Sequence, residues 1–171
     1  EQSILINGLT GRATFNTDVS IVDRQAGGIE IAGSAGSVIF SNPVTLTDQL
    51  GASTAAGVLV SGNLSGNLVE FTDNLTVTST SVTAGATERT DGNGILISGN
   101  AAGSAFRAVG VTTVNGADLE SILITNESGN VDFLGETRVR NRATEGIAVT
   151  GSSGSVEFGV TTPRRLAQVS N

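Results

Sequence analysis

The sequence predicts an all-β fold, a right-handed parallel β-helix (a solenoid) with about six coils of three short strands each. Three observations lead to this prediction: six apolar triplets recur along the chain, a glycine-containing turn follows each triplet, and one phenylalanine belongs to each coil. Strands this short bury too little surface alone, whereas stacked coils share one continuous core. No convincing helical periodicity is present, which agrees with an all-β fold.

The first strand of each coil is an apolar triplet such as Ile4-Leu5-Ile6. Strand alternation directs the outer two residues of a triplet inward and the central residue outward. We assign residues 1–162 to the β-helix, and residues 163–171, which follow the interruption at Pro163, to a C-terminal tail or cap. The coils are expected to start near residues 4, 29, 58, 95, 122 and 147.

A Gly-x-x-Gly turn follows most triplets, with one extra residue in the third and fourth coils. In the fifth coil, Asn126 stands where the first glycine of the turn belongs. Asparagine is the non-glycine residue that best tolerates a left-handed backbone. The replacement therefore predicts a positive φ at this position of the turn.

The second strand of each coil carries one of the six phenylalanines of the chain. Their spacing predicts an interior column of stacked rings, in which each pair contributes about 0.5–1.5 kcal/mol beyond area burial. The register of one member, Phe106, is ambiguous by two residues. The expected column consists of Phe15, Phe40, Phe71, Phe106, Phe133 and Phe158.

A third strand starts four residues after the phenylalanine in several coils, as in Val44-Thr45-Leu46. Right-handed crossing is the strong default for parallel connections, and the hexapeptide repeat of left-handed β-helices is absent. The nonapeptide calcium repeat of β-rolls is absent as well. A β-sandwich built from hairpins would leave the regular spacing of the phenylalanines unexplained.

Composition excludes several kinds of chemistry. The chain has no Cys and no His, which excludes the usual zinc sites, a thiol nucleophile and a Ser-His-Asp triad. With a net charge of -7 and only a small basic cluster, the chain is not expected to bind nucleic acid. The apolar runs are too short to span a membrane. The basic cluster consists of Arg138, Arg140 and Arg142.

The pattern Ile-x-Ile-x-Gly-x-x-Gly-x-Val-x-Phe-x-x-x-Val-Thr-Leu, present in residues 29–46, resembles the repeats of large bacterial surface exoproteins. These include haemagglutinin-like adhesins and autotransporter-type passengers, which have the pectin-lyase-like right-handed β-helix. The resemblance covers residues 3 to about 162 and implies an extracellular or cell-surface location. The same fold hosts polysaccharide lyases, glycoside hydrolases, phage tailspikes and adhesins, so the resemblance indicates the fold more than one function.

Each outward position of a β-helix becomes a row along the rod. The central residues of the first strands form a row in which apolar side chains predominate, and such rows usually mark an interface. Its partner would be another copy of the chain or a neighbouring domain. Alternatively, the chain covers the row with its own long segments, residues 47–56 and 78–93. The leucines of the row are Leu5, Leu59, Leu96 and Leu123.

A second outward row lies next to the phenylalanine column and carries charges. Arg107 is expected between two acids, which predicts a salt-bridge ladder worth about 0–1 kcal/mol for each exposed pair. In lyases of this fold, carboxylates bind Ca²⁺ and an Arg or Lys removes a proton, so a catalytic or calcium site is the sharper alternative. The row runs through Glu70, Arg107, Asp132 and Glu157.

No cofactor is expected. Acidic turns such as Asp73-Asn74 and Asp91-Gly92-Asn93 have oxygen ligands suited to Ca²⁺, but they are also ordinary turn residues, and that interpretation is favoured. The third strands present a further outward row of Ser and Thr that ends at Arg138, which is ordinary for an exposed strand position.

The leading hypothesis is a non-catalytic structural or adhesive repeat domain of a large secreted or cell-surface protein, acting as a rigid stalk or interaction surface. The expected partners are other copies, neighbouring domains, and extracellular polysaccharide or a host surface. One alternative is a polysaccharide-active lyase or hydrolase, although the Trp and Tyr that usually line sugar-binding grooves are absent. Another is a module that assembles into a filament or sheet, because bare coil ends are unpaired strand edges.

Overall fold

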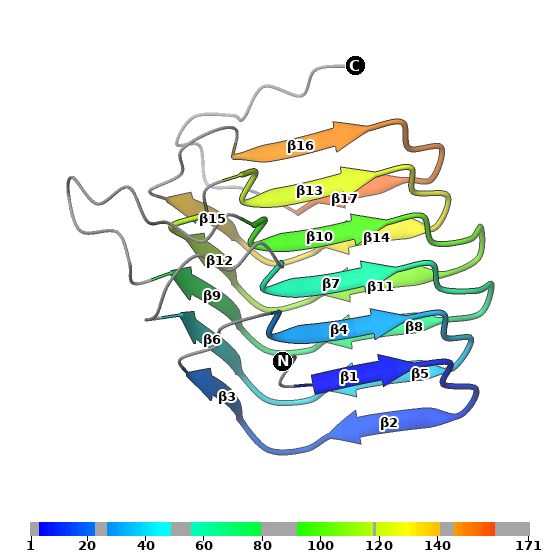
Figure 1. Cartoon of the computed structure of the whole chain (residues 1–171), viewed down its shortest axis with the longest axis horizontal. Coiled ribbons are helices and arrows are strands. Elements are labelled where there is room, and N and C mark those ends of the chain that lie inside the picture. Colours follow the sequence, from blue (N-terminus) through cyan, green and yellow to red (C-terminus); the bar gives the residue numbers. More distant parts are fainter. Residues whose placement is uncertain are drawn as a thin grey trace.

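The computed structural model describes residues 4–22, 27–48, 56–79, 92–117, 119–140 and 146–159. These residues form a parallel β-solenoid in which the chain passes through three sheets in turn and then rises to the next coil (Figure 1). All strand pairs are parallel, and the coils wind in a right-handed sense (Figure 1). The predicted fold class is confirmed.

Sheet A contains the apolar triplets, and its strands follow one another in coil order. Its six strands begin at the six coil starts expected from the sequence. They are β1 (Ile4–Asn7), β4 (Ile29–Ala32), β7 (Val58–Ser61), β10 (Ile95–Ser98), β13 (Ile122–Thr125) and β16 (Ile147–Thr150).

Sheets B and C contain the second and third strands of each coil. Sheet B is formed by β2 (Arg12–Phe15), β5 (Ser37–Phe40), β8 (Leu68–Phe71), β11 (Ala105–Ala108), β14 (Asn130–Phe133) and β17 (Val156–Phe158). Sheet C is formed by β3 (Val19–Val22), β6 (Val44–Asp48), β9 (Leu75–Ser79), β12 (Thr112–Asn115) and β15 (Thr137–Arg140).

Two six-stranded sheets and one five-stranded sheet amount to five complete coils and two strands of a sixth. The third strand of the sixth coil would fall on residues beyond 159, which lie outside the described part of the chain. The C-terminal tail or cap assigned to residues 163–171 lies outside it as well.

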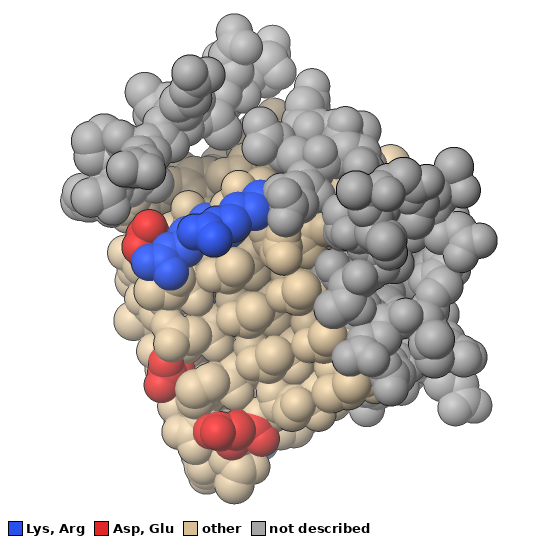
Figure 2. Space-filling model, turned by 90° about the vertical axis from the view of Figure 1, so that its left-hand side faces the viewer, with Lys and Arg blue, Asp and Glu red and all other residues tan. Residues whose placement is uncertain are grey.

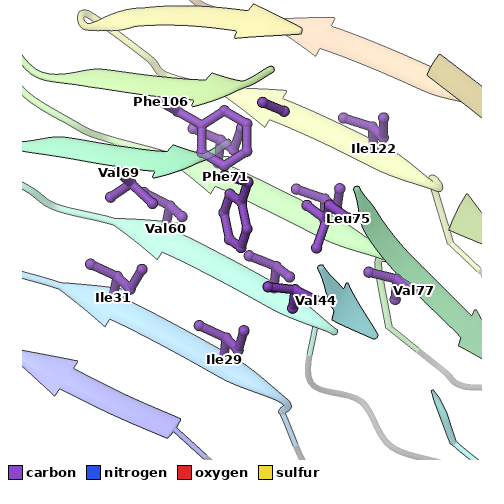
Figure 3. Packing of buried hydrophobic residues seen from close by; sticks show 14 of the residues in the cluster. Ile29, Ile31, Val44, Val60, Val69, Phe71, Leu75, Val77, Phe106 and Ile122 are labelled. Atoms are coloured by element: carbon purple, nitrogen blue, oxygen red, sulfur yellow. The ribbon is translucent and has the colours of Figure 1, made fainter. Parts of the chain in front are cut away.

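The core lies between the three sheets and consists of the inward side chains of successive coils. In β4, for example, Ile29 and Ile31 are fully buried whereas Glu30 between them is not. The side chains of Val60 and Val69 from one side and Leu75 from the other meet around the ring of Phe71 (Figure 3). Alternating β-branched residues therefore supply the continuous core that single strands cannot form.

The phenylalanines do form one column, but not at one register. Phe15, Phe40 and Phe71 are stacked with ring centroids 4.6 and 4.7 Å apart, and Phe133 and Phe158 are stacked at 5.0 Å. In the fourth coil, Ala108 occupies the position opposite Phe71, whereas Phe106 pairs with Val69.

This shift resolves the two-residue ambiguity at Phe106. Its ring enters the space left by the small side chain of Ala108 and lies above that of Phe71 (Figure 3). It approaches from a different strand position, so it is tilted by 48° and 47° against Phe71 and Phe133. The column is continuous, but the ring of Phe106 is not parallel to its two neighbours.

The turn between sheets A and B has the backbone conformation expected from the replacement of glycine. Asn126 has a φ of 51° and is the one non-glycine residue with positive φ in the described part of the chain. Gly33 and Gly62, at the same position of other coils, have φ values of 57° and 60°. The positive φ predicted at Asn126 is confirmed.

Candidate interaction surfaces

The leucine row lies on the outer face of sheet A, which faces the viewer in Figure 1. Leu59, Leu96 and Leu123 pair directly with one another on β7, β10 and β13. Each is partly exposed, and Leu5 in the first coil is 55% exposed. Glu30 separates Leu5 from the other three. The uninterrupted part of the row therefore spans three adjacent strands.

A column of small side chains runs beside the leucines on the same face. Its members Ser61, Ser98 and Thr125 are consecutive Cα partners, two residues after the leucines. Together the two columns give sheet A an outer surface of partly exposed leucines next to small polar groups. Of the two segments proposed to cover the row, residues 49–55 and 80–91 lie outside the described part of the chain.

The charged row lies on the outer face of sheet B. Arg107 faces Glu70 on one side and Asp132 on the other, in register. Its Nη1 lies 3.6 Å from Glu70 Oε1, and its Nε lies 3.9 Å from Asp132 Oδ2. The arginine side chain is 43% exposed, so each pair contributes at most about 1 kcal/mol.

Glu157 continues this row beyond Asp132 and is exposed. A guanidinium is a donor and not an acceptor, and this one is flanked by a carboxylate on each side. The arrangement is that of a row of ion pairs along a solvated strand face. No cluster of three or more potential metal ligands occurs among the described residues.

The outer face of sheet C carries the Ser and Thr row and ends in a basic band (Figure 2). Arg138 and Arg140 on β15 are both exposed, while Arg142 of the predicted cluster lies outside the described residues. Arg138 Nη2 donates a hydrogen bond of 2.6 Å to Glu136 Oε2, and this hydrogen bond lowers the pKa of the Glu136 carboxyl. Part of the small basic cluster is therefore paired with an acid.

The side chains of the turn Asp73-Asn74 accept hydrogen bonds from backbone N–H groups of the solenoid. The backbone N–H of Asn74 donates to Asp73 Oδ1 at 2.7 Å, and Asn74 Oδ1 accepts from the N–H of Val111 in the next coil at 3.0 Å. These are ordinary turn contacts. Of the second acidic turn considered for Ca²⁺, Asp91 lies outside the described residues.

A polar ladder that was not predicted from the sequence runs inside the turn between sheets A and B. Its members follow the positive-φ residue of each turn and hydrogen-bond from coil to coil. Asn63 Oδ1 accepts from the N–H of Ser34, Asn100 Oδ1 accepts from the N–H of Asn63, and Glu127 Oε2 accepts from the N–H of Asn100. The ladder consists of Ser34, Asn63, Asn100 and Glu127, all buried, and Ser152.

The side-chain amides of the ladder also donate. Asn63 Nδ2 lies 3.2 Å from the carbonyl oxygen of Ile31, and Asn100 Nδ2 lies 2.7 Å from Glu127 Oε2. The other oxygen of Glu127 accepts from the N–H of Gly129 at 3.0 Å. The buried carboxylate is thus held by three N–H donors and satisfies the turn's backbone. In the sequence, the ladder was signalled by the position after the first residue of the turn, which is polar in five of the six coils.

No family model matches this chain, and the comparisons with curated proteins and with solved structures found no match. Among the described residues, no helix has the length and apolar character needed to cross a membrane.

Proposed function

We propose that the chain is a non-catalytic structural and adhesive repeat domain of a secreted or cell-surface protein. The stacked coils serve as a rigid stalk, and the outward rows serve as contact surfaces. The observation that carries the proposal is the continuity of the interior. A column of rings and a ladder of hydrogen bonds both run from coil to coil along the axis.

Continuity gives stiffness because each coil is held to the next in several independent ways. Asn63 bonds to both neighbouring coils, and Phe71 contacts the rings above and below it. Bending the rod would therefore break buried hydrogen bonds and, at the same time, separate packed rings. Close packing makes such deformation costly.

The contact function is assigned to the outer face of sheet A. Leu59, Leu96 and Leu123 form an apolar strip that a neighbouring domain, another copy, or an extracellular surface would cover. The ion-pair row on sheet B offers no comparable apolar area. We therefore place adhesion on sheet A and expect Leu96→Glu to weaken it.

Stiffness is tested by measuring distances between two spin labels. The chain has no native cysteine, so a label attaches only to a cysteine that is introduced. Asn7→Cys and Thr150→Cys place labels at equivalent positions of the first and last strands of sheet A. Five coil spacings of about 4.8 Å predict one narrow backbone separation near 24 Å. In the matched pair Ala32→Cys and Thr150→Cys, the labels are one coil spacing closer together. The separation should therefore shorten to about 19 Å.

A broad distribution, or distances that do not scale with the number of coils, would contradict a rigid stalk. The enzyme alternative has its own readout: turnover of an acidic polysaccharide that is lost in Arg107→Ala would replace the structural proposal by a catalytic one.

A further inference from the structure

Three asparagines of the chain are followed directly by glycine: Asn7, Asn93 and Asn115. Such a step is chemically labile, because glycine has no side chain to hinder the attack of its backbone nitrogen on the asparagine side chain. The three steps have the same two residues, so a large difference in their reactivity within the folded chain has to come from the structure.

Asn7 and Asn115 are both held in strands. Asn7 is the last residue of β1, and Asn115 is the last residue of β12. The N–H groups of Gly8 and Gly116 donate to carbonyl oxygens of the next coil at 3.0 and 3.1 Å. In both steps, the nitrogen that would attack is therefore held by a good hydrogen bond at the end of a strand.

The step at Asn93 is held less firmly. Asn93 precedes β10 and belongs to no strand. The N–H of Gly94 donates to the carbonyl oxygen of Glu120 at 3.4 Å, the longest of the three distances. Asn93 Oδ1 is buried and has no hydrogen-bond partner among the described residues. Because weakly held segments open first, Asn93 is the asparagine whose side chain and following nitrogen meet most readily.

Packing requires the glycine at position 94. A Cβ added there would collide with the side chain of Val114 and with the carbonyl oxygen of Ser121. Both contacts lie in the close-packed corner between sheets C and A, which leaves no room for a side chain. The residue that makes this step labile is therefore the one that the fold needs at this position.

We propose that Asn93 is a site of spontaneous deamidation in the folded protein. The backbone nitrogen of Gly94 attacks Cγ of Asn93 and forms the C–N bond of a succinimide ring. The Cγ–Nδ2 bond breaks, and Nδ2 leaves as ammonia with the proton that Gly94 gives up. Water then opens the ring to aspartate or isoaspartate, and no group is oxidised or reduced.

The product changes the start of β10. It adds a negative charge at a position that the continued register of β10 and β13 places opposite Glu120, and like charges on neighbouring strands repel. Isoaspartate also lengthens the backbone by one methylene group before Gly94, where there is no free space. Deamidation should therefore loosen the strand that carries Leu96.

The test is the conversion of the three asparagines while the full chain is stored at mildly alkaline pH. Cleavage after arginine places them on the separate peptides 1–12, 90–107 and 108–138. Mass and chromatography then report aspartate and isoaspartate in each peptide, and fragmentation separates Asn93 from Asn100. Asn93 should convert several times faster than Asn7 or Asn115. In denaturant, the three asparagines should convert at similar rates, because the fold no longer distinguishes them.

Asn93→Gln is the test variant, and Asn115→Gln is its matched control. Glutamine has one more methylene group, so its ring closes much more slowly. The first variant should abolish conversion at position 93, and the second should leave the conversion of Asn93 unchanged. No conversion of Asn93 in the folded chain, faster conversion of Asn7 or Asn115, or the same order of rates in denaturant would overturn the proposal. The spin-label distances test the stalk separately, because the deamidation does not depend on the proposed function.

Discussion

Two columns run through the interior of this solenoid, and they tolerate irregularity differently. The phenylalanine column behind sheet B continues although Phe106 enters it from a position two residues away from the others. The polar ladder keeps its position in the turn, even where the residue changes from Asn100 to Glu127.

The difference follows from the forces involved. Apolar packing has no direction, so a ring is accepted wherever it fills the volume. A buried hydrogen bond needs a donor and an acceptor in fixed places, and an unsatisfied partner is costly. The apolar column is therefore specified by volume and the ladder by position. Four experiments sharpen or break this comparison.

Phe71→Ala should have the largest effect. Phe71 is fully buried and contacts Phe40 and Phe106, so its removal leaves a cavity in the middle of the column. The expected loss is about 3–5 kcal/mol of unfolding free energy. Denaturant melts measure it, and a loss below about 1 kcal/mol would mean that the ring contributes little to the core.

Asn100→Ala should cost about 1–3 kcal/mol, because the N–H of Asn63 loses its acceptor and Glu127 loses a donor. Asn42→Ala is the control: this partly exposed asparagine also makes a coil-to-coil hydrogen bond, to the carbonyl oxygen of Asn16. Water replaces that contact, so its loss should stay within about 0.5 kcal/mol. Equal losses for the two asparagines would contradict the role assigned to burial.

The exchange Phe106→Val with Ala108→Phe should move the fourth ring into register with the other five. Because the interior volume is nearly conserved, the double variant should change stability by less than about 1.5 kcal/mol. Ala108→Phe alone adds a second ring to a filled space and should cost about 1–3 kcal/mol. A double variant less stable than this single one would show that the column depends on position, as the ladder does.

The smallest effect is expected at the surface pair Glu136 and Arg138. The hydrogen bond from Arg138 lowers the pKa of Glu136, so its contribution is present above the ordinary carboxyl pKa and is lost as the pH falls through the lowered value. Arg138→Ala should raise the Glu136 pKa toward its ordinary value in an NMR titration. Arg140→Ala, which removes only a weaker Coulombic contribution, should raise it less. The reverse order would contradict the hydrogen bond as the main cause.

The outward rows were predictable because they depend only on alternation within a strand. Arg107 was placed between Glu70 and Asp132 from the sequence, and the structure has that order. Whether another surface covers Leu96 is a different kind of question. It depends on contacts between distant parts of one chain or between chains, which strand alternation does not specify.

The amino-acid sequence by itself determined the fold class, the start of each coil and the positive φ at Asn126, because these follow from local periodicity and local backbone preference. Only the tertiary structure decided that Ala108 occupies the ring position in the fourth coil and that Asn100 and Glu127 join in one buried ladder. Each of these depends on what the coils above and below supply, and residues 25 or more positions apart in the chain meet there only after the coils have stacked.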